Sequence, residues 1–75
     1  MSETPASECA QKQTLMQHVQ DHLIRIAELS RATAEAIANE AENLVRELDK
    51  QVEREIGAKE RCLGALRQHR HDHGC

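Results

Sequence analysis

A chain of 75 residues with no aromatic side chain and a formal net charge of −3 can form one small domain at most. Its seven Leu, four Ile and three Val residues supply only a thin core. A domain of this size buries only about 60% of the surface that its unfolded chain exposes. These properties exclude a large monomeric core, and they favour burial of apolar surface between chains.

Neither membrane insertion nor export is expected from the sequence. No run of 18 apolar residues occurs, so no segment has the length of a membrane-spanning helix. Residues 1–10 have neither the basic start nor the apolar run of a signal peptide. The three cysteines, Cys9, Cys62 and Cys75, form no even framework and no Cys-x-x-Cys pair. We therefore expect a cytoplasmic protein.

The chain divides into a predicted flexible leader over residues 1–7, a long helix over residues 8–69 and a tail rich in His and Cys over residues 70–75. Thr4 and Pro5 suit a helix N-cap followed by proline at the first helical position. Beyond them, apolar or small residues recur at helical spacings of three and four. The residues that we assign to an oligomer interface are Leu15, Val19, Ile26, Ile37, Ala41, Leu44, Leu48, Val52, Ile56, Leu63 and Leu66.

This apolar stripe is interpreted as an eleven-residue repeat. Steps of eleven from Leu15 reach Ile26, Ile37 and Leu48, and a period near 3.67 keeps a stripe on one face of a nearly straight helix. The predicted fold is all-α: one long amphipathic helix forms an oligomeric coiled coil or helical bundle, as a dimer or tetramer. The alanine-rich segment 32–41 would let two helix axes approach closely, which favours an antiparallel dimer centred there.

A break in the long helix is the alternative. Asn39, followed three residues later by Glu42, resembles a capping box that opens a second helix. Folding at that point would give a two-helix hairpin that dimerises into a four-helix bundle. Against this, neither Gly nor Pro occurs over residues 6–56, and short interhelical loops normally use them. Gly57 is a further candidate for a break, because glycine in a helix costs about 1 kcal/mol relative to alanine.

Two groups of side chains are candidate metal ligands. The first pair is four residues apart on the predicted helix, a spacing found in helix-borne metal sites. The second group, at the C-terminal end, offers nitrogen and sulfur donors that suit Zn²⁺, Ni²⁺ or Cu²⁺. The candidate ligands are His18, His22, His69, His71, His73 and Cys75. The simpler interpretation is that these side chains are solvated or lie at the edge of the apolar stripe, and that no cofactor is required.

The sequence carries no Gly-rich phosphate loop and no nucleophile with recognisable supporting residues, so we expect a protein that is not an enzyme. Nucleic-acid binding is not expected either, because the chain is acidic overall and has no aromatic side chain for base stacking. The leading hypothesis is a self-associating helical interaction module, an adaptor or scaffold whose partners are itself and another protein. The alternative is a metal-binding or metal-responsive helical protein that uses the His/Cys-rich tail.

Overall fold

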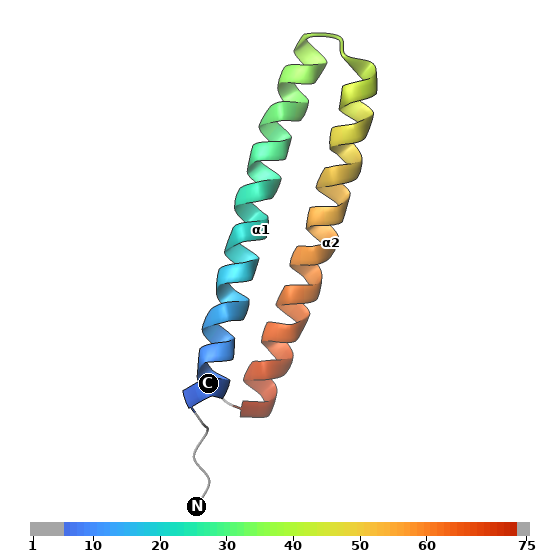
Figure 1. Cartoon of the computed structure of the whole chain (residues 1–75). Helices are drawn as coiled ribbons and strands as arrows, with labels where there is room; N and C mark the ends of the chain where they lie inside the picture. The colour runs from blue at the N-terminus through green and yellow to red at the C-terminus, as the bar shows by residue number, and fades with distance from the viewer. Residues whose placement is uncertain (1–5, 74–75) are drawn as a thin grey trace, which may run out of the picture.

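The structure is a computed structural model that describes residues 6–73, with side chains described over residues 10–72. It consists of two long helices, α1 over Ala6–Ala38 and α2 over Glu42–His73, which run antiparallel and pack against each other (Figure 1). Residues 6–73 contain no strand. The all-α fold predicted from the sequence is confirmed, and its architecture is that of a helical hairpin.

Of the two arrangements considered, the structure shows the hairpin and not one uninterrupted helix. The chain reverses over residues 39–41, whereas Gly57 lies inside α2 without interrupting it. Helix α1 starts at Ala6, within the predicted leader, and α2 continues through His73, within the predicted tail. Residues 1–5 and 74–75 lie outside the described part of the chain.

The turn is a Schellman motif built without glycine. Glu40 takes the left-handed backbone conformation, with a φ of 57°. Its N–H donates to the carbonyl oxygen of Ile37 at 3.0 Å, and the N–H of Ala41 donates to that of Ala36 at 2.9 Å. These are the two hydrogen bonds that define the motif. Ala36 and Ala41 also pack in the same apolar cluster, the contact that usually accompanies it.

The start of α2 differs from the predicted capping box. Ala41 occupies the N-cap position of α2, because its carbonyl oxygen accepts the N–H of Val45 at 2.9 Å. Asn39 instead lies directly after α1, and its N–H donates to the carbonyl oxygen of Glu35 at 3.0 Å. The break near residue 39 therefore occurs, but the closure of α1 produces it, and not an Asn39 cap on α2.

The contact between the helices follows a seven-residue repeat. Buried or partly buried residues recur in steps of three and four along both helices, and this row of residues is called the seam below. The mean spacing of 3.5 is that of left-handed coiled coils, so the predicted eleven-residue period is wrong for this contact. In α1 the seam contains Leu15, Val19, His22, Ile26, Leu29, Thr33 and Ala36. Facing these, it contains Ala41, the N-cap residue of α2, and within α2 it contains Val45, Leu48, Val52, Glu55, Lys59, Cys62, Leu66 and His69.

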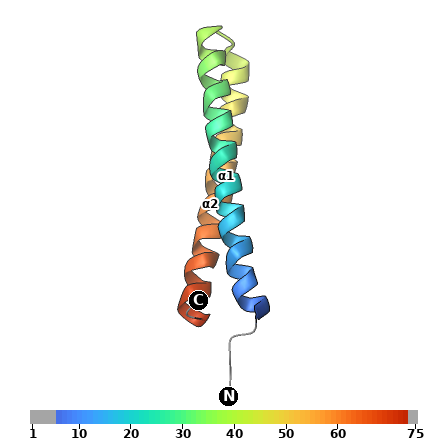
Figure 2. The same cartoon turned by 90° about the vertical axis from the view of Figure 1, so that its left-hand side faces the viewer.

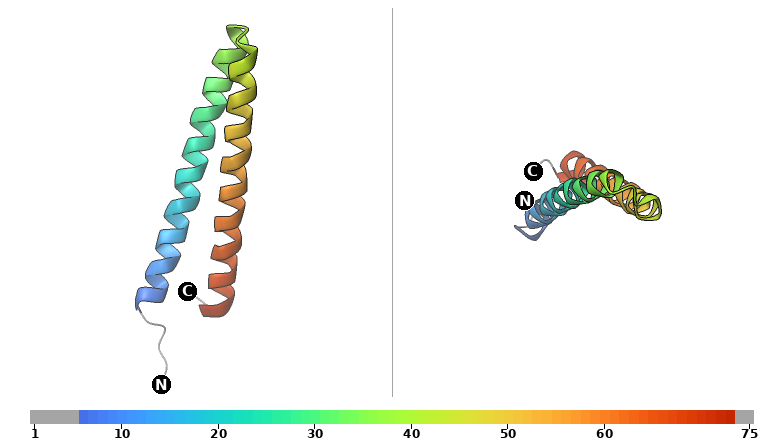
Figure 3. Two further views of the ribbon diagram at one scale, coloured as in Figure 1. Left: turned by 45° about the vertical axis from the view of Figure 1, so that its right-hand side comes forward. Right: turned by 90° about the horizontal axis from the view of Figure 1, so that it is seen from above.

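The buried apolar core is small and lies near the turn. Among the described residues it consists of Leu29, Ala36 and Leu48, with partly buried Ala and Val side chains packed around them. The alanine-rich segment thus lets α1 and α2 of one chain approach, and the helices separate slightly toward the other end of the hairpin (Figures 2 and 3). We call this other end, where α1 begins and α2 ends, the open end. Neither helix of the described part is long and apolar enough to cross a membrane.

Candidate interaction surface

A polar contact joins the two helices in the middle of the seam. The ring Nδ1 of His22 lies 2.7 Å from Oε1 of Glu55. Because a carboxylate only accepts, the imidazole N–H donates this hydrogen bond. Both side chains are largely covered, at 28% and 26% exposure. A hydrogen bond between two partly buried groups depends on their alignment, so this pair favours the observed register of α1 against α2.

The structure separates most of the predicted metal ligands. His18 is exposed, whereas His22 is turned into the seam toward Glu55. His69 is buried at the open end and lines a shallow hollow with Leu15 and Gln11 of α1, while His71 is exposed. The side chain of His73 and all of Cys75 lie outside the described part. Within residues 10–72, no three His, Cys, Asp or Glu side chains gather in an arrangement that would hold a metal ion.

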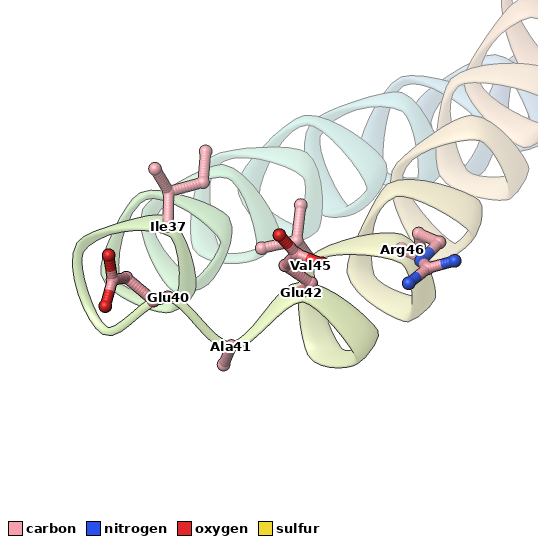
Figure 4. Close-up of a pocket in the computed structure, with 6 residues that line it drawn as sticks. All are labelled: Ile37, Glu40, Ala41, Glu42, Val45 and Arg46. Atoms are coloured by element: carbon pink, nitrogen blue, oxygen red, sulfur yellow. The ribbon is translucent and has the colours of Figure 1, made fainter.

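A second hollow lies at the turn. It is lined by Ile37, Glu40, Ala41, Glu42, Val45 and Arg46. Figure 4 shows that these side chains point in diverging directions, so no common point receives several polar groups. Small-molecule sites usually offer a few convergent polar groups in a concave apolar wall. The hollow therefore belongs to the outer surface of the turn, where Ile37 is exposed.

The residues predicted for an oligomer interface divide into two sets. Leu48 is buried, and most of the others are partly buried between α1 and α2 of the same chain. Ile37, Leu44 and Ile56 are exposed. The eleven-residue count combined these sets, because it joined Leu15 of the seam to Ile37 outside it.

One flank of the hairpin carries apolar side chains in a regular row. Met16 and Leu23 are exposed on α1 and lie seven residues apart; Ile56, exposed, and Leu63, half-buried, have the same spacing on α2. Each residue directly follows a seam residue, so all four stand beside the seam at equivalent positions. Two antiparallel helices are related by a two-fold axis normal to their common plane, and equivalent positions therefore fall on the same side. We call these four residues the apolar flank.

Ile56 and Leu63 are among the residues predicted for the oligomer interface, whereas Met16 and Leu23 are not. The pattern that identifies them in the sequence is the seven-residue repeat from Met16 to Leu23, continued by Ser30 and Ile37. A seven-residue repeat distinguishes this row from the seam row, whose residues come one position earlier in the chain. Other exposed large apolar residues, Ile24 and Leu44 among them, lie outside the flank.

Comparisons of the chain with known protein families, with curated proteins and with solved structures find no match.

Proposed function

We propose that the chain is a self-associating helical interaction module, an adaptor or scaffold whose hairpins pair into a four-helix bundle. The observation that supports this most directly is the exposed apolar flank beside a core of three buried side chains. Apolar area removed from water stabilises by roughly 25 cal/mol per Å². A hairpin that exposes a regular apolar row gains stability when another pair of helices covers that row.

The size of the chain supports the same proposal. A single core below about 70 to 80 residues rarely supplies more than about 3 to 5 kcal/mol, and oligomerisation is one of the usual remedies. Four-helix bundles bury facing apolar rows of two hairpins around one core. Exposed apolar residues away from the flank, such as Ile24 and Leu44, leave further surface for a different protein.

The test is the mass of the chain in solution, measured by sedimentation equilibrium over a dilution series, with circular dichroism on the same samples. We expect a discrete species of at least twice the 8.5 kDa of one chain, with melting that depends on concentration. A monodisperse species of 8.5 kDa that keeps its full helical signal on dilution would refute self-association.

Metal binding at the open end is the second candidate. The observation in its favour is that α2 extends through His73, so that His69 and His73 lie four residues apart on one helix. This is a spacing at which helices hold Zn²⁺. The test is calorimetric titration of the reduced protein with Zn²⁺, beside a His69→Ala, His73→Ala variant. Stoichiometric uptake that the variant loses would support a site, and equal weak uptake by both proteins would refute it.

A further inference from the structure

We propose that a second copy of this chain covers the apolar flank in antiparallel orientation, so that the turn of one hairpin lies beside the open end of the other. This inference rests on the proposed self-association. It adds which face of the hairpin contacts the second copy, and how the two hairpins are oriented relative to each other. It follows from two properties of the described residues: the spacing of apolar side chains on one flank, and the order of charges along the same flank of α2.

The spacing selects the face. Met16, Leu23, Ile56 and Leu63 form an apolar row that adjoins the partly buried seam over the half of the hairpin toward the open end. A row repeated every seven residues fits the side-chain packing of another helix pair. Ile37 continues the α1 row at the turn, fourteen residues after Leu23 with Ser30 between them, and the remaining exposed apolar residues lack this regularity. Ile24 is farther from the seam, and Leu44 stands on the opposite flank because it precedes a seam residue of α2.

The charges select the direction. The flank position of α2 is occupied, at seven-residue steps, by Glu42, Asp49, Ile56, Leu63 and Arg70. Acidic residues therefore lie toward the turn, two apolar residues follow, and a cation lies toward the open end. An antiparallel pair of α2 helices centred between the two apolar residues sets Ile56 against Leu63 of the second copy.

The same arrangement sets Asp49 against Arg70 of the second copy. In an antiparallel pair of identical helices, the numbers of facing residues have a constant sum, and Asp49 with Arg70 has the same sum as Ile56 with Leu63. A two-fold axis makes each contact twice. With the turns together, the acidic residues of both copies would instead gather at one end and the arginines at the other. Complementary charges fix register and orientation, and like charges brought together are unfavourable. The second copy thus complements this flank in shape and charge when the hairpins are antiparallel.

The first experiment tests the face with two neighbouring residues. Leu23 is 48% exposed on the flank, and Ile24, the matched control, is 59% exposed away from it. Leu23→Glu places a carboxylate in the covered surface, where an unpaired charge is costly. We expect sedimentation equilibrium to show affinity weakened by at least about tenfold for Leu23→Glu, and unchanged affinity for Ile24→Glu. Circular dichroism verifies that both variants remain helical.

The second experiment tests the direction by charge exchange between Asp49 and Arg70. These residues are 21 positions apart on α2, about 31 Å along the helix, so one cannot compensate for the other within one chain. Asp49→Arg and Arg70→Asp should each weaken dimerisation roughly two- to thirtyfold, the range for two surface ion pairs. The double variant should recover most of the lost affinity, because opposite charges again meet across the interface.

The outcomes separate the proposals. A wild-type chain that is monomeric refutes self-association itself, and the flank then serves a different partner or none. A wild-type oligomer that Leu23→Glu and Ile24→Glu weaken equally keeps self-association but refutes the flank as its interface. Specific disruption by Leu23→Glu without recovery in the Asp49→Arg, Arg70→Asp variant establishes the face and refutes the antiparallel direction.

Discussion

Glu40→Gly should stabilise the protein, although glycine usually destabilises helical chains. Among the non-glycine residues that the structure describes, Glu40 alone has a positive φ, of 57°. For an L-amino acid this left-handed conformation costs about 1 to 2 kcal/mol. Glycine removes that cost, since it has no Cβ to approach the following carbonyl oxygen. The side chain of Glu40 is exposed, so its removal sacrifices little packing.

The gain is reduced because glycine makes the unfolded chain more flexible, at a cost of about 0.5 to 1 kcal/mol relative to alanine. The difference leaves a net stabilisation of up to about 1.5 kcal/mol, with a midpoint of about 0.75 kcal/mol. For a chain of this length, 1 kcal/mol corresponds to about 4 to 8 °C in melting temperature. Urea unfolding followed by circular dichroism, at one fixed protein concentration, measures the free energy of unfolding directly.

Glu42→Gly is the matched control, because it removes the same exposed carboxylate two residues later, in the first turn of α2. There the backbone is helical and glycine should destabilise by up to about 1 kcal/mol. The two substitutions should therefore have opposite signs. Destabilisation by both would mean that Glu40 is helical, and that the chain continues through residues 39–41 as one long helix.

Two further predictions test the seam. Leu29→Ala should lower the free energy of unfolding by about 3 kcal/mol, since it opens a cavity in the small core. Ile24→Ala, at an exposed position, is the control and should change the free energy of unfolding by less than about 0.5 kcal/mol. Equal effects of the two substitutions in urea unfolding would contradict the described core. His22→Leu combined with Glu55→Leu should raise the free energy of unfolding by about 1 kcal/mol, because leucines at these partly buried positions replace a desolvated polar pair. A loss of stability in this double variant would show that the hydrogen bond contributes more than apolar packing would.

Helix content could be read from the sequence, because apolar spacings of three and four leave no strand pattern. The turn was harder to predict. The capping-box signal at Asn39 and Glu42 gave the right place for the wrong reason, and the absence of glycine argued against any turn. Glu40 adopts the left-handed conformation because packing of α2 onto α1 offsets its local cost. Local propensity does not report a contact between residues that lie far apart in the chain.

The candidate surface was only partly predictable for a related reason. Seam and flank differ by one residue in α1, as Leu15 and Met16 illustrate, and one residue turns a helix by about 100°. A single long helix that pairs with another chain needs only one apolar row for that contact. In the hairpin, the seam packs between α1 and α2 of the same chain, and the apolar flank remains exposed for contact with another chain. The distinction between Leu15 and Met16 therefore depends on the hairpin, which the sequence offered only as an alternative.

The position of the buried side chains sets an order of opening along the hairpin. Leu29 and Leu48 are only 19 residues apart in the chain and enclose the turn, so bringing them together closes a short loop at small entropic cost. Toward the open end the seam residues other than the buried His69 are only partly buried, and they include polar residues such as Lys59. Local opening follows the lowest density of apolar contacts. The two helices can therefore separate first at the open end, while the turn and the buried core beside it stay folded.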